Sequence, residues 1–109
     1  MATAYKVLGQ INPTATTATA IYTVPSATEA VVSSVTICEQ GGSAATFRIA
    51  VRPNGATIAA QHYVVYDASV AANDTIILTL GITLDATDVL EGYASSGDLS
   101  FNAYGSEIT

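Results

Sequence analysis

The side chains that most often carry out enzymatic chemistry are scarce in this sequence. His62 is the only histidine among 109 residues. Any acid–base scheme, including a Ser-His-Asp triad, would therefore have to pass through His62. Its neighbours Gln61 and Tyr63 form no recognisable catalytic motif with it, and a histidine on a partly covered strand is the commoner situation. We expect no catalytic residues and no enzymatic activity.

The sequence also lacks the ligand patterns of a metal or cofactor site. Cys38 is the only cysteine and lies in an apolar run, where a free cysteine usually packs as a small hydrophobic residue. Asp85 and Asp88 lie three residues apart around a turn, but calcium requires about six to eight oxygen ligands, and a turn aspartate usually bonds its own backbone. No Cys-x-x-Cys, His-Glu-x-x-His or phosphate-binding glycine loop occurs. We expect no bound metal and no cofactor.

Two of the three basic residues, Arg48 and Arg52, lie in the otherwise apolar stretch TFRIAVRPNGATIAAQHYVVYD. Pro53-Asn54-Gly55 predicts a type I turn followed by a left-handed glycine. The stretch therefore predicts a hairpin, in which the second strand is Thr57–Tyr66. A bulge in either strand would invert the assignment of side chains to its two faces.

Side chains alternate between the faces of a strand, so the hairpin predicts two surfaces. With Arg52 opposite Ala56, one face carries Phe47, Ile49, Val51, Ala59, Gln61, Tyr63 and Val65. The other carries Arg48, Ala50, Arg52, Ile58, Ala60, His62, Val64 and Tyr66. Arginine beside apolar and aromatic side chains is typical of a surface that binds protein. We predict an interface that contains Arg48, Arg52, Ile58, His62, Val64 and Tyr66, with acidic residues of a neighbouring subunit as partners of the arginines. The alternative is that the arginines keep an exposed sheet face soluble.

Composition narrows the classes of partner. The chain has a formal net charge of −6 and only three Lys and Arg residues, whereas nucleic-acid phosphates and anionic membranes attract clustered positive charge. No apolar run approaches the roughly 18 residues of a membrane span, and no signal peptide is evident. We expect no nucleic acid and no membrane as partner. A surface rich in small residues is suited to close packing against other protein chains.

Short apolar blocks separated by turn residues predict an all-β fold. The expected strands are Ala4–Leu8, Thr19–Val24, Ala30–Glu39, Thr46–Arg52, Thr57–Tyr66, Thr75–Leu80, Val89–Ala94 and Leu99–Tyr104. About eight strands at even spacing indicate a single antiparallel β-sandwich of the jelly-roll kind over residues 1–109. Residues 1–4 are expected to form an N-terminal arm that lies on a neighbouring subunit.

The order of several strand segments resembles small structural proteins of tailed-bacteriophage virions, including phages of cyanobacteria. The similar segments are IYTVPSATEAVVSSVTICE, TFRIAVRPNGA and GITLDATDVLEGYASSGDLSFNAYGSEIT. Within them, the matching motifs are Tyr22–Pro25, Phe47–Val51, Tyr66–Asp67 and Leu99–Phe101. The resemblance implies a jelly-roll or sandwich module that decorates a capsid or builds a neck, tail or fibre, and it supplies no catalytic residues.

We therefore expect a non-enzymatic virion protein that is assembled in the host cytoplasm. The leading hypothesis is a capsid decoration or cement protein that forms a homo-oligomer and binds the major capsid protein. The alternatives are a neck, tail or fibre component, or a lectin-like module that binds host polysaccharide. For the lectin-like module, Tyr63, Tyr66, Tyr93 and Tyr104 are the candidate sugar platform.

Overall fold

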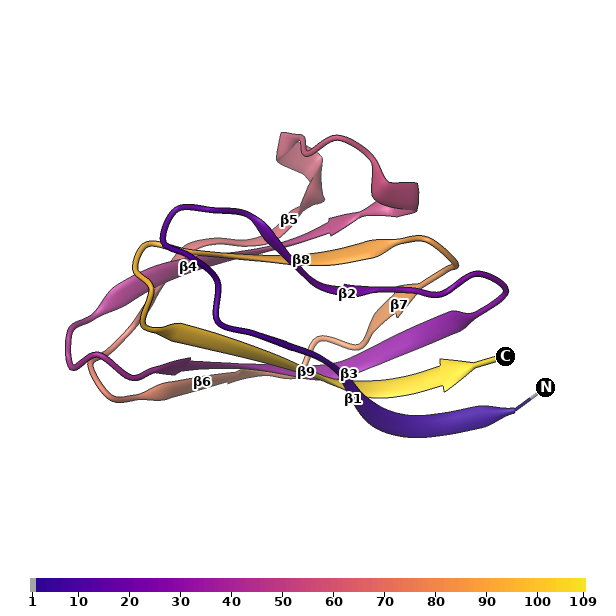
Figure 1. The fold of residues 1–109 in the computed structure, drawn as a ribbon, viewed down its shortest axis with the longest axis horizontal. Coiled ribbons are helices and arrows are strands. Elements are labelled where there is room, and N and C mark those ends of the chain that lie inside the picture. Colours follow the sequence, from indigo (N-terminus) through magenta and orange to yellow (C-terminus); the bar gives the residue numbers. More distant parts are fainter. Residues whose placement is uncertain (1) are drawn as a thin grey trace.

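Apolar residues at alternate positions of the strands build two antiparallel sheets that pack face to face (Figure 1). The computed structural model describes residues 2–109. Its strands are β1 (Thr3–Ile11), β2 (Thr19–Thr23), β3 (Glu29–Glu39), β4 (Ala45–Arg52), β5 (Tyr63–Val70), β6 (Thr75–Leu78), β7 (Ile82–Leu84), β8 (Val89–Ala94) and β9 (Leu99–Ile108). Two short 3₁₀ turns, η1 (Pro53–Gly55) and η2 (Ala60–His62), lie between β4 and β5. The expected antiparallel β-sandwich is confirmed.

One sheet has the order β1-β9-β3-β6, with β7 also beside β3, and the other has the order β2-β8-β4-β5. β6 and β7 pair with successive segments of β3, and Gly81, with a φ of 62°, lies between them. The sequence predicted one strand there, Thr75–Leu80, and did not predict β7. If β6 and β7 are counted as one interrupted strand, nine strands become the expected eight. The resulting order is compatible with a jelly roll.

The core lies between the two sheets and is formed by the inward residues of both. Phe47 on β4 and Phe101 on β9 meet edge to face across the interior, with ring centroids 6.2 Å apart. Both are buried, as are Ile37, Ile49 and Leu90. A pair of aromatic rings from opposite sheets fixes the distance between the layers as well as burying apolar area.

The predicted hairpin differs from the structure both at its turn and after it. Asn54 and Gly55 both have positive φ, 53° and 67°, and the N–H of Ala56 donates to the carbonyl of Pro53 at 3.0 Å. The turn is therefore of type I′, with Asn54 and Gly55 at its two central positions. Pro53 precedes these positions instead of occupying the first of them. The expected strand Thr57–Tyr66 was wrong, because the chain does not return directly to the ladder.

Instead, the chain leaves the sheet and forms a segment over residues 53–62, which projects beyond the four-stranded sheet (Figure 1). It rejoins the sheet only at Tyr63, where β5 begins. Ile49 consequently pairs with Val65. We call residues 53–62 the β4–β5 segment.

The two ends of the chain lie side by side. Ala2 and Thr109 exchange two backbone hydrogen bonds of 2.9 and 2.8 Å, and β1 pairs with β9 from Thr3 onward. The residues expected as an N-terminal arm thus continue the sheet of their own chain from Ala2 to Ala4, and Met1 lies outside the described residues. Among residues 2–109, no helix has the length and apolar character needed to cross a membrane.

Candidate functional site

Arg48 lies at the centre of a side-chain cluster on the outer face of the four-stranded sheet. Its Nε donates to Oδ1 of Asp67 at 2.7 Å and its Nη2 to Oδ2 at 3.3 Å. The guanidinium carbon lies 4.2 Å from the ring centroid of Tyr66 and 4.4 Å from that of Tyr93, which places it in cation–π contact with both rings. The hydrogen bonds to Asp67 raise the pKa of Arg48 further above its usual range. Arg48 is therefore always cationic.

A β-bulge brings the partners of Arg48 together. The register between β4 and β5 shifts between Phe47 and Ile49, so Tyr66 and Asp67 both lie opposite Arg48. Asp67 has a φ of 53°, in the left-handed region that a bulge residue can occupy. The extra residue turns two consecutive side chains of β5, one aromatic and one acidic, toward the same guanidinium group.

Arg52 fixes the β4–β5 segment to the sheet. Its Nε donates to Oε1 of Glu91 on β8 at 3.0 Å, and its Nη1 donates to the carbonyls of Gly55 and Ala56 at 3.2 and 3.0 Å. Glu91 is buried. One side chain therefore joins the tight turn to a neighbouring strand.

His62 closes the other end of the same segment. It is 9% exposed, and its Nδ1 accepts the backbone N–H of Ala59 at 3.0 Å. The imidazole thereby bonds the turn in which it lies.

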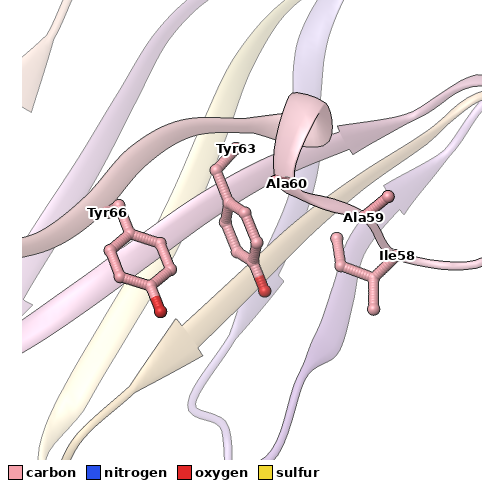
Figure 2. A pocket seen from close by; sticks show the side chains of 5 residues that line it. All are labelled: Ile58, Ala59, Ala60, Tyr63 and Tyr66. Carbon is pink, nitrogen blue, oxygen red and sulfur yellow. The ribbon is translucent and has the colours of Figure 1, made fainter.

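A shallow pocket of about 590 Å³ opens between the β4–β5 segment and the start of β5. It is lined by Ile58, Ala59, Ala60, Tyr63 and Tyr66 (Figure 2). The ring of Tyr63 lies between Tyr66 and Ile58, and the hydroxyls of both tyrosines point the same way (Figure 2). The two rings meet edge to face with centroids 5.0 Å apart. The pocket thus combines an apolar floor with two phenolic hydroxyls.

The structure brings together most, but not all, of the residues predicted for the interface. Tyr66 is 59% exposed, and Ile58 and Val64 are also exposed. Arg48 and Arg52 both lie on β4, but each pairs with an acidic residue of its own chain, Arg48 with Asp67 and Arg52 with Glu91, rather than with a neighbouring subunit. His62 is buried, contrary to its predicted place on the open face.

Three residues of the site were not among those predicted for the interface. Tyr63 was assigned to the face that carries Phe47 but contacts Tyr66 instead, because a second register shift between Ile49 and Ala50 changes its face. Asp67 and Tyr93 complete the arginine cluster. Of the four tyrosines considered as a sugar platform, Tyr104 lies apart on β9 of the other sheet. Tyr63 contacts Tyr66, and Tyr66 and Tyr93 both contact Arg48.

The aspartates considered for calcium bond the backbone. Oδ2 of Asp88 accepts the N–H of Asp85 at 2.9 Å, and its Oδ1 accepts the N–H of Asn54 at 2.8 Å. Within residues 2–109, no group of three or more His, Cys, Asp or Glu side chains is placed to hold a metal ion. Asp88 instead links the turn after β7 to the turn after β4.

Glu39 is a buried carboxylate at the end of β3. It accepts backbone N–H groups from Asn73 at 2.9 Å, Gly41 at 2.7 Å and Gly42 at 2.9 Å. The hydrogen bond from Asn73, with those from the two glycines, lowers the pKa of Glu39 despite its burial. Glu39 thus holds together two loops, one after β3 and one before β6.

A second polar cluster joins the two sheets. Tyr22 on β2 donates its hydroxyl to Oε2 of Glu107 at 2.5 Å, and Nζ of Lys6 lies 3.1 Å from Oε1 of the same carboxylate. Burial and the bond to Glu107 raise the pKa of Tyr22, whereas the bonds from Tyr22 and Lys6 lower the pKa of Glu107. The carboxylate links β1, β9 and β2.

No protein-family model matches the chain, and no curated protein shows significant similarity to it.

Proposed function

We propose that this chain is a non-enzymatic structural protein of a bacteriophage virion, and that it decorates the capsid. The assignment to a virion rests on the resemblance of its strand segments to phage structural proteins. The observation that carries the proposed mode of action is the Arg48 cluster beside the exposed side chains of Ile58, Val64 and Tyr66. We call these three residues, with Tyr63, the tyrosine face.

The tyrosine face is held in place before any partner arrives. Tyr66 contacts the guanidinium group of Arg48, and its ring meets the ring of Tyr63 edge to face. Arg52 and His62 fasten the β4–β5 segment that carries Ile58. A preorganised aromatic surface loses little side-chain entropy on binding, which favours protein association.

The charges near the tyrosine face are already neutralised. Arg48 pairs with Asp67, and Arg52 pairs with Glu91. A partner would therefore meet aromatic and aliphatic surface with arginine stacked behind it, which is the composition enriched in protein interfaces. Burial of such apolar area on a capsomer, at about 25 cal/mol per Å², would stabilise the shell mechanically.

The experiment mixes the purified protein with capsids that lack it and measures co-sedimentation and the temperature at which the shells disrupt. We expect the protein to bind and to raise that temperature. Protein that fails to bind shells, and that is found in only a few copies per purified virion, would overturn capsid decoration in favour of a neck, tail or fibre position.

Two variants assign binding to the tyrosine face. Tyr66→Ser should weaken shell binding by about tenfold or more, as expected for an aromatic residue in the centre of an interface. The matched control is Ile77→Ser, which removes an apolar side chain that is 67% exposed on β6 of the other sheet. Equal binding by both variants would rule out the tyrosine face as the contact.

A lectin-like module is the second candidate function, and the pocket beside Tyr63 is the observation that favours it. Sugars stack on aromatic rings and bond to hydroxyl groups, and Tyr63 and Tyr66 present both features. Tyr63→Ala should then abolish binding to host polysaccharide while leaving the fold intact. Unchanged adsorption to the polysaccharide would remove this candidate.

A further inference from the structure

β1 forms one margin of the five-stranded sheet, with β9 as its neighbour on one side (Figure 1). The other three sheet margins are interrupted in ways that discourage further pairing. β2 has five residues and is followed closely by Pro25, β6 and β7 have four and three residues, and β5 contains the Asp67 bulge. β1 has nine residues and pairs regularly from Thr3 to Val7 before its register shifts.

The register with β9 shows which backbone groups of β1 face outward. Ala2 and Thr109 exchange both of their hydrogen bonds, and in an antiparallel pair such positions alternate with positions that do not bond across the ladder. Ala4 and Lys6 are therefore bonded to β9. Thr3, Tyr5 and Val7 direct their N–H and C=O groups away from β9, toward the open margin.

The side chains of the same segment leave this margin accessible. Residues 3–7 are all exposed, and Tyr5 is 87% exposed. Lys6 is the one charged residue of the segment, and its ammonium group is paired with Glu107. A lysine on an edge strand is a common device against edge pairing, but the charge of Lys6 is paired within its own chain.

We propose that β1 is a homodimerisation edge, where two copies of this chain join their five-stranded sheets through antiparallel pairing of residues 3–7. This inference does not depend on the proposed virion function. Antiparallel pairing places a two-fold axis at Tyr5, which makes the contact isologous.

The outward groups of β1 are self-complementary about this axis. Tyr5 pairs with Tyr5 of the second copy, and Thr3 pairs with Val7 in both directions. All three are outward-facing positions, so each pair exchanges both of its hydrogen bonds. A strand from another protein could match these groups, but only a second copy matches them by symmetry without any further sequence requirement.

The side chains fit the same register. The two Tyr5 rings become direct cross-strand neighbours, with Val7 diagonal to each, and aromatic pairs of this kind stabilise sheets. Lys6 lies opposite Ala4 of the second copy rather than opposite the other Lys6, so no pair of like charges faces across the new ladder. The charges and the backbone hydrogen bonds therefore both favour the register in which Tyr5 lies opposite Tyr5 of the second copy.

The test is sedimentation equilibrium of the full chain over a range of concentrations, combined with amide hydrogen exchange. We expect a reversible dimer with a dissociation constant of roughly 1 μM to 1 mM, because one strand pair buries less than the ~1,600 Å² of a standard interface. The amides of Tyr5 and Val7 should become protected as the dimer forms, whereas that of Ala4 is protected in the monomer as well.

Tyr5→Pro is the decisive variant, because it removes an outward N–H and leaves the ladder with β9 intact. It should remain monomeric at concentrations where the wild type dimerises, and Tyr5→Thr, which keeps the N–H, should dimerise more weakly than the wild type. Ile77→Ser at the opposite margin should dimerise normally. A wild type that stays monomeric at about 1 mM, a Tyr5→Pro variant that dimerises like the wild type, or Tyr5 amides that exchange equally at all concentrations would each overturn the proposal.

Discussion

Arg48 and Asp67 form a two-point ion pair across a β-bulge, with the rings of Tyr66 and Tyr93 against the same guanidinium group. Asp67 remains about half exposed, and exposed ion pairs contribute little to the free energy of folding. The pair matters more for position, since it sets the direction of Tyr66 on the tyrosine face.

Arg48→Lys should therefore disturb the aromatic cluster far more than it disturbs stability. Lysine keeps the positive charge but loses the planar fork that bonds two carboxylate oxygens and stacks on rings. We expect the NMR signals of the Tyr66 and Tyr93 rings to shift, with only a small change in the unfolding temperature. Asp67→Asn should move the same signals. Unchanged ring signals in both variants would show that the guanidinium group does not position Tyr66.

Gly9→Ala should destabilise the fold strongly, because β1 passes very close to β2 at this point. A Cβ at Gly9 would lie 1.9 Å from the carbonyl oxygen of Ile21, a backbone atom that cannot turn aside. We expect a loss of about 1–3 kcal/mol or more in the free energy of unfolding, as for other overpacked sites. Gly97→Ala is the control, since a Cβ there meets nothing within 4 Å. Denaturant titration of the two variants checks the difference.

Glu39→Gln should reduce the dependence of the free energy of unfolding on pH at acid pH. The folded-state pKa of Glu39 is lowered by backbone hydrogen bonds, so its contribution to stability is complete above the unfolded pKa of about 4.3 and is lost as the pH falls through the folded value. As the pH falls below about 4.3, the wild type should lose stability more steeply than the variant. Urea titrations at several pH values measure this, and parallel curves would contradict it.

Tyr22→Phe should instead change how the free energy of unfolding depends on pH at alkaline pH. Burial and Glu107 raise the folded-state pKa of Tyr22, so the stability linked to its proton is complete below the unfolded pKa of about 10 and is lost as the pH rises toward the folded value. We expect the wild type to lose stability above about pH 10 more steeply than Tyr22→Phe. Tyr5→Phe, at an exposed ring, is the control and should follow the wild type.

The β-sandwich was predictable because its signals are local. Short β-rich blocks, such as Thr19–Val24 and Ala30–Glu39, are bounded by turn residues, and the alternation along Ala30–Glu39 selects one buried face. Phe47 and Ile49 were assigned to one face of the hairpin on this basis, and both are buried in the core. The exposed positions of Ile58, Val64 and Tyr66 were also predicted.

The composition of the site followed from contacts between distant parts of the chain. The sequence placed Arg48 and Tyr66 on one face. No local pattern indicated that a bulge would turn Asp67 toward Arg48, or that Tyr93 on β8 would lie opposite Arg48. His62 was assigned to the open face because Thr57–Tyr66 was taken as one strand. Its burial depends on the β4–β5 segment, which leaves the ladder at the Asn54-Gly55 turn.

The sequence by itself determined the fold class and most of the strands, since these depend on side-chain period and turn chemistry. Only the tertiary structure decided the partners of Arg48 and Arg52 and the outward face of β1. Register and bulges settle those features, and they arise from competition among cross-strand hydrogen bonds over the whole sheet. A shift of one residue in a strand reverses every side chain beyond it, so small non-local differences decide which residues meet.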